Sequence, residues 1–134
     1  MLHNSLVPEI TVSDFEKSLH FYTEVLGFHV EYMRENEGFA FLSYEGSQLM
    51  IDQIDIGRTW KTGEMERPFG RGVNFQINVP HLKPLLDSLL KSKIQLFAGP
   101  EEKTYKTESG ETKVKQFLVQ DYDGYLLRFC EAVS

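Results

Sequence analysis

The chain has 134 residues, 41% of them hydrophobic and 25% charged, as is typical of a globular protein, and we expect a single domain over residues 1–134. Twenty acidic residues against 14 Lys and Arg give a formal charge of −6, which argues against nucleic-acid binding because that affinity depends on basic contacts to phosphates. One cysteine, no apolar run long enough to span a membrane, and no secretory signal over residues 1–12 together predict a cytoplasmic protein without an internal disulfide.

The first module, residues 5–53, opens with an apolar strand that leads into an amphipathic helix. Val7–Val12 reads as the strand, and Ser13 and Glu16 have the spacing of a capping box at the helix start. Apolar residues then recur at helical spacing until Gly27 ends the helix. These residues are Phe15, Leu19, Tyr22 and Leu26. Three further strands are predicted, over Phe28–Met33, Phe39–Tyr44 and Gln48–Asp52. The order of this module is β-α-β-β-β.

Residues 54–71 connect the two modules. Their turn-forming residues are Gly57, Gly63, Pro68 and Gly70. A structureless connection of this length is uncommon in a small protein unless it has a function. Its aromatic residues, Trp60 and Phe69, look exposed. We therefore interpret the segment as both a linker and a functional loop.

The second module, residues 72–131, repeats the order β-α-β-β-β. Val73–Val79 predicts a strand, and leucines between Leu82 and Leu90 predict a helix. A strand is expected over Ile94–Ala98, and Gly99-Pro100 breaks it. Further strands are expected over Lys103–Thr107, Lys113–Val119 and Tyr125–Glu131. A hairpin turn at Glu108-Ser109-Gly110 and a turn at residues 121–124 separate the last three.

The two modules look like copies of one another. At a fixed shift of 67 positions, apolar residues of the first strand and helix coincide. The matching pairs are Ile10 with Ile77, Val12 with Val79, Phe15 with Leu82, Leu19 with Leu86 and Tyr22 with Leu89. Duplicated modules of this kind favour an α+β fold in which two βαβββ modules form a concave, partly closed mixed sheet with helices on the outer face. A concave sheet is a natural place for a ligand.

Alternation along the strands predicts which residues face that ligand. In Val73–Val79 every odd position is apolar and every even position carries an amide, so Asn74, Gln76 and Asn78 point away from the helices. In the two closing strands Glu45-Gly46 matches Asp123-Gly124, which makes Met50 equivalent to Arg128 and Asp52 equivalent to Cys130. A polar face that is merely solvated is the alternative.

Three segments resemble the vicinal oxygen chelate superfamily, which includes glyoxalase I, extradiol dioxygenases, fosfomycin-resistance enzymes and bleomycin-binding proteins. They are Ile10-Thr11-Val12-Ser13-Asp14, then Ser18-Leu19-His20-Phe21-Tyr22 with Val25-Leu26-Gly27-Phe28, and Val119-Gln120-Asp121-Tyr122-Asp123-Gly124-Tyr125. The resemblance covers nearly the whole chain.

Metalloenzymes of that superfamily hold one divalent ion with His, Glu or Gln from the first and last strands of each module. The resemblance carries these four positions over to Val7, Met50, Asn74 and Arg128. None is a usual ligand for a hard divalent ion, so we expect no metal and no other cofactor. A shift of two residues along each strand would instead recruit Glu9, Gln76, Asp52 and Cys130, a set that is chemically conceivable.

Other chemistries have weaker support in the sequence. The four histidines read as surface or capping residues, with His3 in a loose terminus. Cys130 has no histidine assigned beside it and is interpreted as a packing residue. Glycine-rich phosphate loops are missing. No catalytic residue is therefore assigned.

Without metal donors, the chain is most similar to the bleomycin-binding branch, whose members look like non-catalytic dimers that sequester a cationic glycopeptide. We therefore expect a homodimer that captures a small molecule, such as a cationic glycopeptide drug, without catalysis. The expected ligand-binding residues are Met50, Asp52, Trp60, Phe69, Asn74, Gln76 and Arg128. Trp60 and Phe69 would stack on a flat tail, and carboxylates would offset a positive end.

Two alternatives to capture stay open at this point. One is a glyoxalase-type or dioxygenase-type enzyme of the same fold, with shifted metal ligands or with Arg128 gripping a substrate carboxylate. The other is a module that senses a metabolite. A cation at Arg128 also favours an anionic group on the ligand, against the expectation of a purely cationic one.

Overall fold

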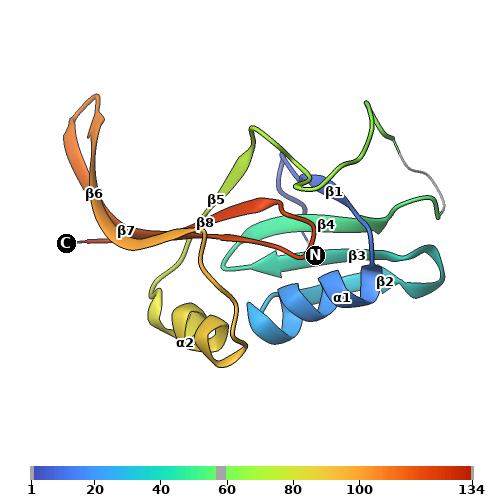
Figure 1. Ribbon diagram of the computed structural model, residues 1–134. Coiled ribbons are helices and arrows are strands. Elements are labelled where there is room, and N and C mark those ends of the chain that lie inside the picture. The colour runs from blue at the N-terminus through green and yellow to red at the C-terminus, as the bar shows by residue number, and fades with distance from the viewer. Residues whose placement is uncertain (1, 57–59, 134) are drawn as a thin grey trace. The chain divides into compact units, whose positions relative to one another are not determined.

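The computed structural model describes residues 2–56 and 60–133, so that Gly57 of the connecting segment lies outside the described residues. The chain divides into two compact units, Met1–Phe69 and Gly70–Ser134, each built on one four-stranded sheet (Figure 1). The boundary between them falls within residues 54–71. Both sheets contain parallel and antiparallel strand pairs, and neither sheet is closed on itself. The helices and mixed sheets confirm the predicted α+β class, and the order of the elements confirms the two predicted modules. Over the described ranges, no helix is long and apolar enough to cross a membrane.

The sheet of the first unit has the strand order β1-β4-β3-β2. Its strands are β1 (Glu9–Val12), β2 (His29–Arg34), β3 (Phe39–Tyr44) and β4 (Ser47–Gln53). β1 runs parallel to β4, whereas β3 is antiparallel to both of its neighbours. A short 3₁₀ helix, η2 (Glu35–Glu37), joins β2 to β3, and Gly38 follows it with φ +63°. The predicted strands are all present, with β3 at its predicted bounds.

The helix of the first unit begins one residue later than its capping box predicts. The N-cap is Asp14, whose Oδ1 accepts a hydrogen bond from the Lys17 amide at 3.1 Å, so the prediction that Ser13 caps the helix is wrong. Ser13 serves instead as an anchor, because its carbonyl accepts from the Gln53 amide at 2.8 Å and its hydroxyl accepts from Arg67 at 3.1 Å. Both residue types are good caps, and these long-range bonds decide between them.

Helix α1 (Phe15–His20) continues as a single π-helical turn, η1 (Phe21–Val25). A π turn holds more residues than an α turn, so it changes which side chains face the sheet. Phe21 and Val25 are buried as a result, while Leu19 of the predicted stripe is only half-buried. Gly27 ends the helix with φ +90°, as predicted.

The second unit has the equivalent strand order β5-β8-β7-β6. Its strands are β5 (Asn74–Asn78), β6 (Ala98–Thr107), β7 (Gly110–Gln120) and β8 (Leu126–Ala132), and its helix is α2 (Lys83–Lys91). β5 is parallel to β8, and β7 is antiparallel to both β8 and β6. The buried residues Leu82, Leu85 and Leu89 lie at or within the helix, as the leucine pattern predicts.

One predicted strand of the second unit is wrong. Residues 94–97 form no strand, and Gly99-Pro100 lies inside β6 rather than breaking it. The pairing of β6 with β7 shifts between Ala98 and Glu101, which is the signature of a bulge. Gly99 supplies the left-handed backbone of that bulge, with φ +84°. A glycine next to a proline therefore bends this strand instead of ending it.

The paired residues show that both units use one register. Glu9 lies opposite Met50 in the first unit, and Gln76 lies opposite Arg128 in the second. Thr11 opposite Asp52 likewise corresponds to Asn78 opposite Cys130. This agrees with the equivalences predicted from the repeat. It also places each of these pairs on the sheet face opposite to the buried residues Ile51 and Phe129.

Candidate functional site

A chain of hydrogen bonds links the polar residues of β5 and β8. The Arg128 guanidinium donates through Nη2 to Gln76 Oε1 at 2.8 Å, and Gln76 donates through Nε2 to Asn78 Oδ1 at 3.0 Å. Gln76 and Asn78 are exposed, as strand alternation predicts. The Nε atom of Arg128 is buried and has no hydrogen-bond partner among the described residues. Arg128 is thus held at one edge of its guanidinium and keeps an unused donor.

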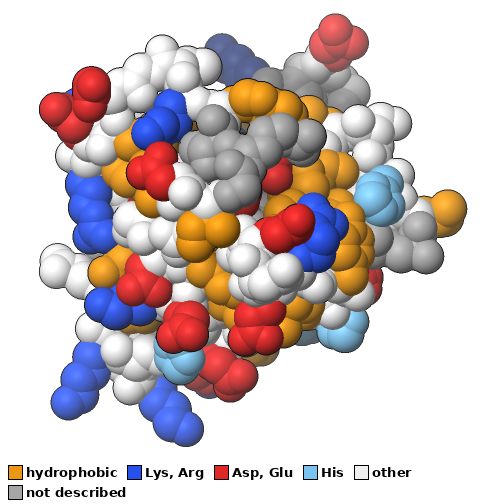
Figure 2. Space-filling view, turned by 90° about the vertical axis from the view of Figure 1, so that its right-hand side faces the viewer, with side chains coloured by type: hydrophobic (Ala, Val, Ile, Leu, Met, Phe, Trp, Pro, Cys, Tyr) orange, Lys and Arg blue, Asp and Glu red, His pale blue; other side chains and the backbone are white. Residues whose placement is uncertain are grey.

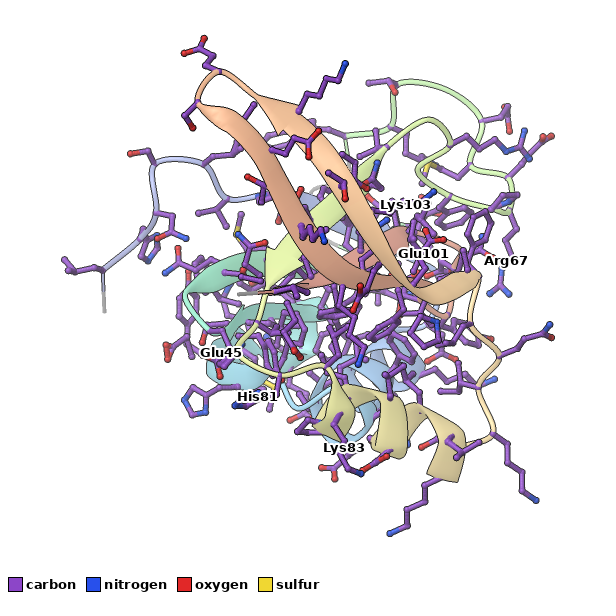
Figure 3. The ribbon with its side chains drawn as sticks, turned by 90° about the vertical axis from the view of Figure 1, so that its left-hand side faces the viewer. Glu45, Arg67, His81, Lys83, Glu101 and Lys103 are labelled. Atoms are coloured by element: carbon purple, nitrogen blue, oxygen red, sulfur yellow. The ribbon has the colours of Figure 1, made fainter. Side chains whose placement is uncertain are left out.

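A second polar group lies beside Arg128, around Gln116 of β7. Gln116 is buried and lies opposite Cys130, and its Oε1 accepts from the Tyr105 hydroxyl at 3.0 Å. Its Nε2 donates to Glu101 Oε1 at 3.4 Å, so the Glu101 carboxylate is engaged with an amide (Figure 3 labels Glu101 on β6). Nothing in the alternation of the sequence distinguished Gln116 as a buried polar centre.

Cys130 is a buried thiol in this group. Burial raises the pKa of the thiol above its ordinary value, and the positive charge of Arg128 opposes that shift in part. Its Sγ is a weak donor to Gln116 Oε1, at 3.9 Å. The residue therefore stays protonated at neutral pH, in agreement with the packing role predicted for it.

The equivalent face of the first unit is aromatic rather than polar. Phe41 lies opposite Met50 and Phe39 lies opposite Asp52. The Tyr32 ring stacks on Phe41 with centroids 5.3 Å apart, and the Arg34 guanidinium carbon lies 4.1 Å from the centroid of Phe39. Met50 and Asp52 are both half-buried. Phe39 and Phe41 are themselves buried, so that among these three rings Tyr32 is the exposed one.

The N-terminal segment lies against that same face. Gln48 of β4 accepts from the Asn4 amide at 2.6 Å and donates to the Leu2 carbonyl at 2.7 Å. The centroids of the His3 and Phe41 rings are 4.8 Å apart. The prediction that His3 belongs to a loose terminus is therefore wrong. The signal that was missed is Gln48, whose two-ended amide can pair with extended backbone.

The two aromatic residues of the connecting segment differ in exposure. Trp60 is 69% exposed, as predicted, whereas Phe69 is only 6% exposed. The prediction that both rings are exposed is wrong for Phe69, because burying a phenylalanine ring is favourable wherever the chain can fold over it. Trp60 is the aromatic side chain of this segment that is open to a flat ligand.

Charges do not gather into one patch on the molecular face drawn in Figure 2, where acidic and basic side chains are interspersed. A hollow of 710 Å³ in the second unit lies at the start of α2, where Figure 3 labels His81 and Lys83. Three of its charged side chains form bonds within the unit, because Glu131 accepts from the Leu82 amide at 2.7 Å and Lys83 pairs with Asp87 at 2.7 Å.

The residues at the positions carried over from metalloenzymes do not fit a divalent ion. Val7 has no lone pair, the thioether of Met50 is soft, and Arg128 brings a cation that is already bound to an amide oxygen. The shifted set fares little better. Gln76 Oε1 already accepts from the Arg128 guanidinium, and that positive charge would oppose a metal ion bound at the same oxygen. Within residues 2–56 and 60–133, no three His, Cys, Asp or Glu side chains form a group that could hold a metal.

The comparisons with known proteins agree with this fold. The sequence profile of the Glyoxalase/Bleomycin resistance protein/Dioxygenase superfamily matches residues 4–129. A protein from the mobile metagenome of Vibrio pseudocholerae is 17% identical, with a TM-score of 0.73, and the alignment covers 100% of this chain and 98% of that one. A virulence protein of Salmonella typhimurium is 21% identical, with a TM-score of 0.68 and coverage of 99% and 100%.

A superfamily member from Alicyclobacillus acidocaldarius is 16% identical, with a TM-score of 0.64, and the alignment covers 98% of this chain and 92% of that one. At these identities the likeness concerns the fold alone. The comparison with curated proteins finds no match.

Proposed function

The chain belongs to the Glyoxalase/Bleomycin resistance protein/Dioxygenase superfamily, and from that premise we propose that it captures a small molecule without transforming it. One observation carries the proposal. At a position where metalloenzymes of the superfamily hold their ion, this chain has Arg128, and the guanidinium is fixed by Gln76 at 2.8 Å. A fixed cation repels a metal ion and still binds a ligand, so the site keeps affinity while losing its metal-dependent chemistry.

The proposed contacts differ between the units. The first unit offers Met50 and Asp52 beside the aromatic face, together with the exposed ring of Trp60. The second unit offers the amides of Asn74 and Gln76 and the guanidinium of Arg128. Aromatic stacking and a few fixed polar groups are what small-molecule sites in proteins generally use. Phe69 is buried and is no longer proposed as a stacking residue.

A bleomycin-type drug is the first ligand to test, because the acidic chain favours a cation and the exposed Trp60 favours a flat heteroaromatic tail. The test is calorimetric titration of the drug into wild type, Trp60→Ala and, as a matched control, Phe97→Ala, whose ring is 58% exposed outside the segment. Losing one stacking ring weakens binding by roughly threefold to tenfold, so Trp60→Ala should do so and Phe97→Ala should not. Absence of heat and of any thermal shift with wild type would reject this ligand.

A metal-free enzyme is the second candidate, and the unused Nε donor of Arg128 favours it, because an arginine can hold a substrate carboxylate during a reaction. Metal analysis of the purified protein, together with glyoxalase and ring-cleavage assays, separates it from capture. Turnover in either assay, with or without stoichiometric metal, would refute pure capture.

We also propose a cytoplasmic homodimer. The proposal rests on the family resemblance for the dimer and on the free Cys130 thiol for the compartment, since disulfides are rare in reducing compartments. Size-exclusion chromatography with light scattering measures the mass, and a strict monomer at every concentration would contradict the dimer.

A further inference from the structure

Arg128 is prepared to bind an acceptor that the described part of the chain does not supply. A guanidinium carries five N–H donors in a rigid plane, and here one nitrogen, Nη2, is used by Gln76. The Nε donor is buried and has no partner within the described residues. An unsatisfied buried donor is costly, and a ligand that accepts from it recovers that cost.

The partners of Arg128 hold its orientation without neutralising it. Gln76 is neutral, and its amide is in turn fixed by Asn78 at 3.0 Å. No carboxylate among the described residues forms an ion pair with Arg128, and Glu101 of β6, which β7 separates from β8, accepts from Gln116 at 3.4 Å. The cation is thus pre-oriented and uncompensated, which is the arrangement that binds a planar oxyanion in two-point fashion.

The surroundings favour an organic anion over an inorganic one. Leu118 of β7 lies opposite Arg128, and Leu126 lies two residues before it on β8 and points to the same face. Apolar neighbours lower the local dielectric, which strengthens a charge-assisted hydrogen bond, and they pack against the carbon part of a ligand. A small, strongly hydrated ion gains nothing from them.

We propose that Arg128, oriented by Gln76 and Asn78, anchors the carboxylate of a small organic ligand. The inference rests on the proposed capture function and names the class of molecule captured. The overall charge of −6 attracts a cationic ligand at long range, whereas Arg128 binds one anionic group in direct contact. A ligand that has both a cationic part and a carboxylate is therefore compatible with both interactions.

The test compares benzoate with benzamide, two flat probes of nearly equal shape that differ in charge. The Nε–H resonance of Arg128 in ¹⁵N-labelled full-length protein reports binding directly. Benzoate should shift this resonance saturably and bind about tenfold more tightly than benzamide, the difference between a charge-assisted and a neutral hydrogen bond. In the variants, probe binding is measured from the backbone amide resonances of β5 and β8.

Two variants should abolish the preference for benzoate. Arg128→Met removes the cation and keeps an apolar stem, and Gln76→Glu places a carboxylate where Arg128 already bonds, so that the site is neutralised from within. Lys103→Met is the control, because it removes one positive charge from β6 of the same sheet (Figure 3) and leaves Arg128 unchanged. It should keep the preference.

Each outcome decides one proposal. Equal binding of the two probes, a preference that survives Arg128→Met, or no saturable shift with either probe would overturn the carboxylate anchor. Chemical conversion of a bound probe, seen in its own proton spectrum, would overturn capture while leaving the anchor in place. A thermal melt of each variant shows whether it is folded. If Arg128→Met does not fold, the probe preference of Gln76→Glu tests the carboxylate anchor instead.

Discussion

Replacing Gly99 with alanine should destabilise the second unit by much more than the usual cost of losing a glycine. Gly99 has φ +84° in the bulge of β6, and a Cβ added there would lie 2.8 Å from the Gln116 carbonyl oxygen and 3.1 Å from the Phe117 Cα. Both of those atoms belong to the backbone of β7, which is paired on both sides. Neither can move without breaking strand pairing.

Two costs add in this variant. A left-handed conformation costs an L-residue about 1 kcal/mol, and forcing an atom into packed surroundings costs about 1–3 kcal/mol more. Gly72→Ala separates the two, because Gly72 has φ +86° and nothing within 4 Å of the added Cβ. We expect about 2–4 kcal/mol for Gly99→Ala against about 1 kcal/mol for Gly72→Ala.

Thermal unfolding followed by far-ultraviolet circular dichroism measures the difference. For a chain of this size 1 kcal/mol corresponds to roughly 4 °C, so Gly99→Ala should lower Tm by about 8–16 °C and Gly72→Ala by about 4 °C. Urea unfolding gives the free energies independently. Equal losses in the two variants would show that the close approach of β6 to Gln116 does not exist, and would refute the bulge in β6.

Two further predictions concern α2 and the buried thiol. Leu89→Ala should cost about 2–4 kcal/mol in urea unfolding, because Leu89 is 1% exposed, whereas its neighbour Leu90 is 79% exposed and Leu90→Ala should cost less than about 0.5 kcal/mol. Since burial raises the pKa of Cys130 above its ordinary 9.0, the thiol's contribution to stability is fully present below that pH and is lost as the pH rises beyond it. The stability of wild type relative to Cys130→Ser should therefore fall above pH 9, and a difference that is constant with pH would contradict the raised pKa.

Much of the fold could be predicted because hydrophobic periodicity depends on burial, and burial follows the layers of the sheet. β3 begins and ends where a mainly apolar run between two turn segments predicts it, and the equivalence of Met50 with Arg128 follows from matching Glu45-Gly46 to Asp123-Gly124. Strand alternation also placed Asn74, Gln76 and Asn78 on the exposed face. In each case a local pattern was sufficient, since no distant residue competes with it.

The features that were missed depend on partners far away in the sequence. Asp14 rather than Ser13 caps α1 because Gln53 and Arg67 engage Ser13. The N-terminal segment is fixed by Gln48, which lies more than 40 residues further on. A sequence pattern contains the residue types of such contacts but not their pairing.

The duplication explains why equivalent positions can have different chemistry. The pair Glu9 and Met50 occupies the same register in the first unit as Gln76 and Arg128 in the second. In the first unit a carboxylate stands beside a thioether, and in the second an amide stands beside a guanidinium. Backbone pairing sets where these side chains point and places no limit on their charge. A ligand held by the second unit must therefore bring an acceptor, whereas one held by the first must bring apolar surface or a positive charge.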